Sequence, residues 1–86
     1  MVLIDVRTKD EWREGHAKDA LHFEIVRLAR GEMPDIPKDT EIKTYCNAGG
    51  RAGRAKNILL ANGFTNVESI GGIDAAAAHA GGIVQE

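Results

Sequence analysis

Short runs with β-strand character alternate with short helical patterns along the whole of this 86-residue chain. Apolar and β-branched runs predict four strands, at residues 2–6, 20–23, 42–46 and 66–70. The helical spacing of apolar residues predicts helices after Thr8, over residues 25–31 and 51–62, and from Asp74 to Gly81. Because strand and helix alternate with short links, we expect an α/β fold with a central, mainly parallel sheet and helices on both faces.

Several helix ends carry local sequence signals. Thr8 and Glu11 have the spacing of a capping box, which predicts a helix of about two turns before Gly15. Gly63 is placed to end the helix over 51–62, and Asp74 is placed to cap the last helix. We expect the tail, residues 83–86, to be loosely held.

Composition limits the classes of protein that this chain can belong to. From the length of 86 residues we expect one small domain, residues 1–86. The single cysteine excludes an internal disulfide and a zinc site of several thiolates, and the three histidines lack metal-ligand spacing. A net charge of −2 gives no overall signal for nucleic acid, and no apolar run approaches the roughly 20 residues of a membrane span. We expect a monomer without metal or cofactor, which binds neither nucleic acid nor membrane.

The only cysteine, Cys46, stands where a predicted strand passes into a predicted helix. Four residues, two of them glycine, separate it from Arg51. Backbone N–H groups and the positive end of the helix dipole favour an anion at such a position, so the pKa of Cys46 should be lowered. Ligand sites of parallel sheets also lie at the carboxyl ends of strands. Cys46 is therefore a candidate nucleophile, although free cysteines are often buried structural residues.

A series of short motifs extends in order over nearly the whole chain. They are Leu3-Ile-Asp-Val-Arg7, Glu11-Trp12, Glu14-Gly-His16, Tyr45-Cys-Asn-Ala-Gly-Gly-Arg51, Gly63-Phe-Thr-Asn-Val67 and Gly71-Gly72. In this combination the chain resembles a rhodanese (sulfurtransferase) domain, and it is most similar to the single-domain type known from phage shock protein E. The resemblance places Cys46 at the position of the family's nucleophile.

The resemblance implies a thiosulfate sulfurtransferase that works through a persulfide on Cys46. The donor is a small anion such as thiosulfate, and the acceptor is cyanide, a thiol or a thioredoxin-like protein. The resemblance implies that the donor is bound by the residues that follow the cysteine: Asn47, Ala48, Gly49, Gly50, Arg51 and Ala52. Arg51 can either bind the donor or brace the loop, and Ala52 stands where many members have Ser or Thr.

Two other functions remain open on the same residues. The basic residues Arg51, Arg54 and Lys56 suit a sulfur-carrying or partner-binding module with little turnover of its own. Phosphatases and arsenate reductases on the same scaffold have one loop residue more, whereas Cys46 through Arg51 is the six-residue loop of sulfurtransferases. The compartment is also open, since periplasmic placement requires that a leader was removed and cytoplasmic placement requires none.

The other polar and aromatic residues of these motifs have simpler readings. We expect Asp5 and Arg7 to form a structural salt bridge. His16 is expected to be a satisfied structural histidine, and Trp12 a core residue. The capping box is a sufficient explanation of Glu11. Gly71-Gly72 is a turn, which the resemblance places near the rim of the site.

Overall fold

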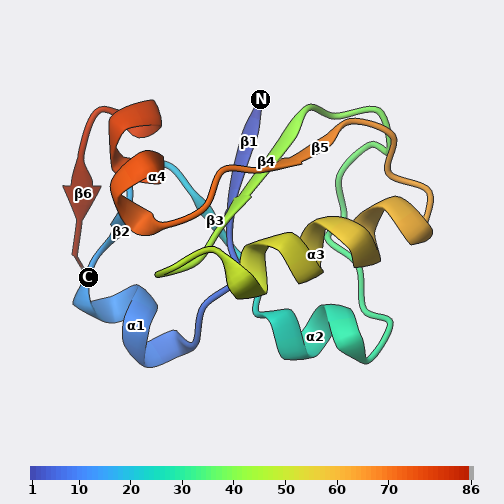
Figure 1. The fold of residues 1–86 in the computed structure, drawn as a ribbon, viewed down its shortest axis with the longest axis horizontal. Coiled ribbons are helices and arrows are strands. Elements are labelled where there is room, and N and C mark those ends of the chain that lie inside the picture. The colour runs from blue at the N-terminus through green and yellow to red at the C-terminus, as the bar shows by residue number, and fades with distance from the viewer. Residues whose placement is uncertain (86) are drawn as a thin grey trace.

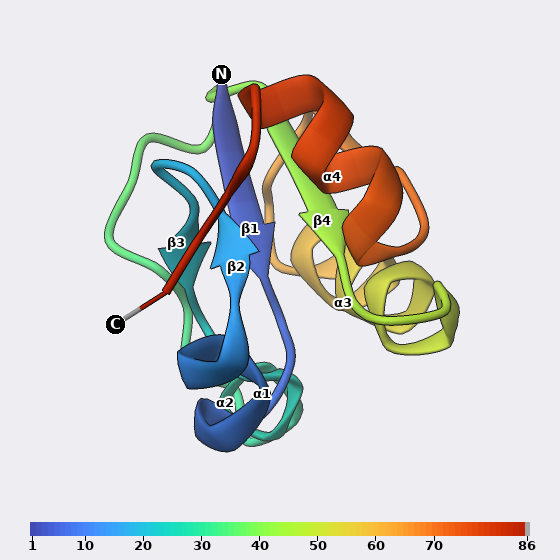
Figure 2. The same cartoon turned by 90° about the vertical axis from the view of Figure 1, so that its left-hand side faces the viewer.

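A computed structural model describes residues 1–85 and shows a parallel sheet at the centre of the chain. The sheet contains β1 (Val2–Asp5), β3 (Leu21–His22), β4 (Ile42–Tyr45) and β5 (Val67–Ser69). Their order is β3-β1-β4-β5, and every neighbouring pair is parallel. Figure 2 shows β3, β1 and β4 in this order. The predicted α/β class is confirmed, and each strand is one or two residues shorter than predicted.

The helices α1 (Lys9–Glu14), α2 (Ile25–Ala29), α3 (Gly50–Ala61) and α4 (Ile73–Ala80) complete the fold (Figure 1). Successive side chains of β1 point to opposite faces of the sheet, so Ile4 and Leu3 belong to different core clusters. The Ile4 cluster contains the buried residues of α2 and α3, and the Leu3 cluster contains that of α4. Helices therefore cover both faces, as predicted.

A second, two-stranded sheet was not predicted. His16–Ala17 (β2) pairs antiparallel with Ile83–Val84 (β6), so the expectation of a loosely held tail is wrong for residues 83–85. Gln85 adds a hydrogen bond from Nε2 to the carbonyl oxygen of Glu14, at 2.6 Å. Glu86 lies outside the described residues. Two residues with no periodicity of their own become a strand only because the other strand lies beside them.

The helix-end signals are confirmed with one exception. The Thr8 hydroxyl accepts a hydrogen bond from the Glu11 amide at 3.3 Å, and the Glu11 carboxylate accepts one from the Thr8 amide at 3.0 Å. Gly63 follows α3 with a positive φ of 94°. Asp74, in contrast, lies in the first turn of α4, and Gly72 occupies the N-cap.

None of the helices in residues 1–85 is long and apolar enough to cross a membrane.

Candidate active site

Residues 46–51, the cysteine loop, connect the end of β4 to the start of α3. Gly49 is the N-cap of α3 and has φ of 104°, a left-handed conformation that glycine adopts without steric cost. This conformation directs the Gly49 amide at the cysteine, and its nitrogen lies 2.9 Å from Cys46 Sγ. The glycine that the sequence places three residues after the cysteine thus turns the backbone around the sulfur.

The Cys46 thiol is buried, but backbone amides surround it. Cys46 is 1% exposed and belongs to the core cluster that contains Ile4. Burial raises the pKa of the thiol, but the backbone amides of Ala52, Gly49, Ala48 and Arg51 lower it by more. The pKa of Cys46 is therefore below that of an ordinary thiol, as the sequence predicted. A thiolate is stabilised here by main-chain dipoles rather than by solvent.

The turn at Gly71-Gly72 forms the wall behind the cysteine loop. The Cys46 amide donates to the carbonyl oxygen of Gly71 at 3.0 Å, and Ala48 and Gly72 form an isolated β-bridge. A Cβ atom at Gly72 would lie 2.4 Å from the carbonyl oxygen of Asn47. The close contact with the loop therefore requires glycine at position 72. The sequence indicates a turn here but does not reveal this contact.

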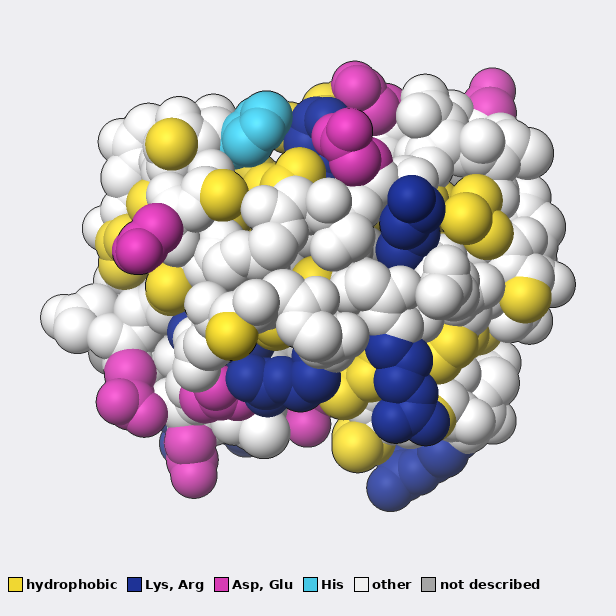
Figure 3. All heavy atoms as spheres, viewed as in Figure 1, with side chains coloured by type: hydrophobic (Ala, Val, Ile, Leu, Met, Phe, Trp, Pro, Cys, Tyr) yellow, Lys and Arg dark blue, Asp and Glu magenta, His cyan; other side chains and the backbone are white. Residues whose placement is uncertain are grey.

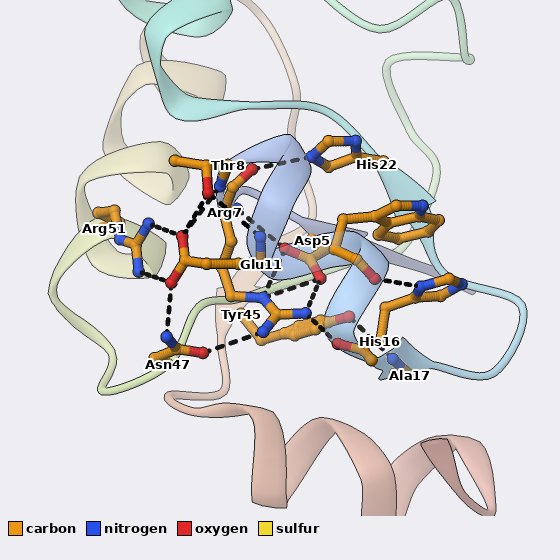
Figure 4. Close-up of polar contacts among 12 residues, drawn as sticks. Asp5, Arg7, Thr8, Glu11, His16, Ala17, His22, Tyr45, Asn47 and Arg51 are labelled. Atoms are coloured by element: carbon orange, nitrogen blue, oxygen red, sulfur yellow. Dashed lines mark hydrogen bonds and ion pairs between the residues drawn. The ribbon is translucent and has the colours of Figure 1, made fainter. Parts of the chain in front are cut away.

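The carboxylate of Glu11, on α1, contacts both ends of the cysteine loop (Figure 4). Arg51 donates two hydrogen bonds to it, with N···O distances of 2.6 and 2.9 Å. Asn47 Nδ2 donates to Glu11 Oε2, and Thr8 donates to Glu11 Oε1 from its amide and its hydroxyl. Arg51 is the leading cause that lowers the pKa of Glu11, to about 2, so this carboxylate stays charged.

A buried ion pair, Arg7–Asp5, contacts the same loop at Asn47. Arg7 and Asp5 are 3% and 0% exposed, and Arg7 Nη2 lies 2.7 Å from Asp5 Oδ2. Arg7 also donates from Nη1 to Asn47 Oδ1 at 3.0 Å and from Nη2 to the carbonyl oxygen of Gly15 at 2.6 Å. The predicted salt bridge between Asp5 and Arg7 is confirmed, and its contact with Asn47 was not predicted. Asn47 therefore connects the two ion pairs, Arg7–Asp5 and Arg51–Glu11 (Figure 4).

The predicted site residues divide into an exposed rim and a buried base. Asn47, Ala48 and Gly50 are exposed, whereas Ala52 is fully buried. The hydroxyl of Thr44 in β4 donates to the carbonyl oxygen of Ala52 at 2.8 Å, which fixes the first turn of α3 on the strand. The side chain of Ala52 thus packs in the core, and only its amide acts on Cys46.

Gly50 differs from Gly49 and Gly72 in its surroundings. A Cβ atom at Gly50 would meet nothing within 4 Å, so no contact within residues 1–85 requires glycine at this position. Sequence reasoning missed Glu11 as a part of the site, and it placed Gly72 only near the rim, without its contact to the loop. Glu11 contacts residues 36 and 40 positions away, and no local pattern signals such a pairing.

A hollow of about 260 Å³ lies beside the cysteine loop. Asn47 and Glu11 border it on the loop side, and Ile73 and Ile83 border it from α4 and β6. Cys46 is not part of the lining of this hollow. Asn47, which directly follows Cys46, is the loop residue that lines it. The hollow can accommodate a small molecule next to the loop.

Trp12 stacks between the two histidines of the N-terminal half. Its ring is parallel to that of His16, with 3.4 Å between centroids, and lies 4.8 Å from that of His22. His16 Nδ1 lies 2.8 Å from the carbonyl oxygen of Trp12, and His22 Nε2 lies 2.8 Å from that of Arg7. These contacts give both imidazoles a structural role on the side of α1.

Comparison with known proteins agrees with the geometry of this site. The family model of the rhodanese-like domain matches residues 1–79. The chain is 35% identical over 71 residues to thiosulfate sulfurtransferase PspE of Escherichia coli K12, covering 81% of this chain and 68% of that protein. It is 33% identical over 81 residues to thiosulfate sulfurtransferase GlpE of Coxiella burnetii, covering 92% and 74%. A solved structure described as rhodanese with anions from E. coli superimposes with a TM-score of 0.81 at 31% identity, covering 99% of this chain and 98% of that one. With its thiol ringed by amides after the third strand of a parallel sheet, and with these relatives, the chain belongs to the rhodanese family.

Proposed function

We propose that this chain is a thiosulfate sulfurtransferase that carries the transferred sulfur as a persulfide on Cys46. The observation that supports this most directly is the position of Cys46 Sγ, 2.9 Å from the Gly49 amide and with a lowered pKa. A thiolate is the required nucleophile for sulfane sulfur, and this loop supplies it without a dedicated base. The names of the relatives PspE and GlpE support the same reaction.

In the first half-reaction the Cys46 thiolate attacks the outer sulfur of thiosulfate. A sulfur–sulfur bond forms to Sγ, the bond between the two sulfur atoms of thiosulfate breaks, and its electron pair leaves with sulfite. Cys46 then carries a terminal sulfur with a negative charge. Amides that lower the pKa of the thiolate suit this second anion, because the N–H groups of the loop are already oriented.

In the second half-reaction an acceptor takes the terminal sulfur and the thiolate is restored. Cyanide, for example, attacks the terminal sulfur, the bond to Sγ breaks, and thiocyanate leaves. A thiolate acceptor leaves instead as a persulfide. The hollow beside Asn47 offers room for the rest of such an acceptor, and a reduced thiol, alone or on a thioredoxin-like protein, is the class that we propose.

Mass spectrometry of the intact protein tests the proposal. Treatment with thiosulfate should add one sulfur, about 32 Da, and cyanide should remove it. Cys46→Ser, which differs from the chain by one atom, is the matched control and should gain nothing. Failure of every sulfane donor tried to modify Cys46 would exclude sulfur transfer through this residue.

A carrier that delivers sulfur to a protein partner is a second candidate, and one surface favours it. Arg54 of α3, Arg27 of α2 and Arg30 at the C-cap of α2 are exposed, and the buried residues of α2 and α3 share one core cluster. Figure 3 shows several basic side chains on the lower part of the face where α2 and α3 lie in Figure 1. A loaded Cys46 that reacts slowly with cyanide but rapidly with an acidic partner would support the carrier. Equal rates with every small thiol would contradict it.

The cysteine loop favours sulfur chemistry over phosphate or arsenate chemistry. It has six residues, and the resemblance to the family implies one residue more for a loop that binds phosphate or arsenate. Assays with an aryl phosphate and with arsenate should therefore show no turnover. If the chain did turn over an aryl phosphate or arsenate, and Cys46→Ser lost this activity, the sulfurtransferase proposal would be wrong.

A further inference from the structure

Both guanidinium groups at the cysteine loop are already paired with carboxylates. Arg51 donates two hydrogen bonds to Glu11, and Arg7 donates three from its side chain to Asp5. Arg51 uses two of its five N–H donors for Glu11, so what these contacts compensate is the charge of each cation and not all of its donors. The local charge of each pair is zero, so the main-chain amides are left as the groups that face the sulfur.

The Glu11 carboxylate accepts five hydrogen bonds, which leaves neither oxygen without a donor. Two come from Thr8 on its own helix, one from Asn47 and two from Arg51. Asn47 directly follows the cysteine, and Arg51 is the last residue of the loop. A single side chain of α1 therefore fixes the distance between the two ends of the loop.

We infer that Glu11 is a positioning and specificity-determining residue, which holds both ends of the cysteine loop and keeps the charge of Arg51 away from the donor. The inference rests on the proposed function for the identity of the donor, and on contacts alone for the effect on Cys46. It gives Arg51 the bracing role and not the binding role. It also predicts that removal of either partner exposes the charge of the other to the donor.

A double-mutant cycle of Glu11→Gln and Arg51→Gln tests whether Glu11 and Arg51 mask each other's charge from the donor. Glutamine keeps the shape of Glu11 and is itself accepted in a capping box, so the start of α1 is preserved. The quantity to measure is the KM for thiosulfate divided by the KM for methanethiosulfonate. Thiosulfate carries two negative charges and methanethiosulfonate carries one. Loss of loop order should change the KM for both donors, whereas an unpaired charge in the site should change the KM for thiosulfate more.

The expected result has opposite signs for the two single variants. Glu11→Gln frees the Arg51 cation and should lower the KM ratio about three- to tenfold at low salt. Arg51→Gln frees the Glu11 anion and should raise the ratio by a similar factor. The double variant has no unpaired charge and should return to within about twofold of the unmodified chain. Asp10→Asn, which removes one charge from the same helix turn without a contact to the loop, is the control and should leave the ratio unchanged.

The double variant decides between the two roles of Arg51. A ratio that stays as high in the double variant as in Arg51→Gln would show that Arg51 contacts the donor itself and would overturn the inference. An unchanged ratio in Glu11→Gln, with normal folding, would also overturn it. A return to the original value in the double variant supports it.

A second readout separates this inference from the proposed function. The rate of Cys46 alkylation by iodoacetamide, followed against pH, requires no sulfur donor. The apparent pKa should fall in Glu11→Gln, rise in Arg51→Gln and return in the double variant, because the Arg51 and Cys46 charges attract each other. If thiosulfate never loads Cys46 but these shifts appear, the proposed function fails and the role of Glu11 stands. If loading occurs without the shifts, the role of Glu11 fails.

Discussion

Replacement of Gly72 by alanine should damage the cysteine loop through a single atom. The φ and ψ angles at Gly72 are −100° and 178°, which alanine adopts freely, so the backbone itself gives no reason for glycine. The added Cβ would lie 2.4 Å from the carbonyl oxygen of Asn47 and 3.3 Å from its carbon. Ordinary C···O contacts are about 3.3 Å or longer, so the turn and the loop must separate by roughly 1 Å.

The cost of that separation can be stated for stability and for activity. Forced displacement in a packed site costs about 1–3 kcal/mol, which corresponds to a fall in Tm of roughly 5–20 °C for a domain of this size. Since Asn47 follows Cys46 directly, a displacement of about 1 Å should also lower kcat about 10- to 100-fold. Urea unfolding and single-turnover loading with thiosulfate measure the two effects.

Gly53→Ala is the matched control for this substitution. Gly53 lies inside α3, and a Cβ there would meet nothing within 4 Å. It should raise stability by about 0.5–1 kcal/mol, because alanine loses less backbone entropy in a helix, and should keep the rate of loading. If Gly72→Ala matched the unmodified chain in both Tm and loading rate, the contact between the turn and the loop would not control the site.

Three further predictions concern charge. Alkylation of Cys46 should reach half its maximal rate below the ordinary thiol pKa of about 8.5, and a midpoint at or above that value would contradict stabilisation by amides. The pKa of Glu11 is lowered from 4.5 to about 2, so the pair with Arg51 stabilises the fold above about pH 4.5 and this contribution is lost as the pH falls toward 2. The full pKa shift of Glu11 corresponds to about 3 kcal/mol of folding free energy, and solvent screening of the partly exposed Arg51 reduces this to roughly 1–2 kcal/mol. The Glu11→Gln variant should not lose this contribution in acid, which acid unfolding measures. Asp5→Asn leaves the charge of buried Arg7 without its partner and should cost about 3–5 kcal/mol in urea unfolding, and a cost below about 1 kcal/mol would show that Asn47 and Gly15 suffice to hold Arg7.

The elements that sequence reasoning found are those with local causes. The capping box of Thr8 and Glu11 and the positive φ of Gly63 depend on residues within one helical turn of each other. The order of alternating strands and helices was enough for the α/β class and for placing Cys46 at a strand end. These features need no knowledge of contacts between distant parts of the chain.

The features that were missed depend on distant parts of the chain. β2 and β6 each have two residues and exist through their mutual pairing across more than 60 positions. Glu11 had a sufficient local explanation, which concealed its contacts with Asn47 and Arg51. Gly72 looked like an ordinary turn residue, although the carbonyl oxygen of Asn47 is what excludes a side chain there. In each case the decisive neighbour lies more than 20 residues away.

The stacking of Trp12 on His16 has a practical consequence for watching this molecule at work. Trp12 is the one tryptophan in the chain and directly follows Glu11. Its indole, parallel to an imidazole 3.4 Å away, is an intrinsic fluorophore beside the helix turn that supports the loop. Emission at a single wavelength would therefore report movement of α1 during sulfur loading, with no label attached to the protein.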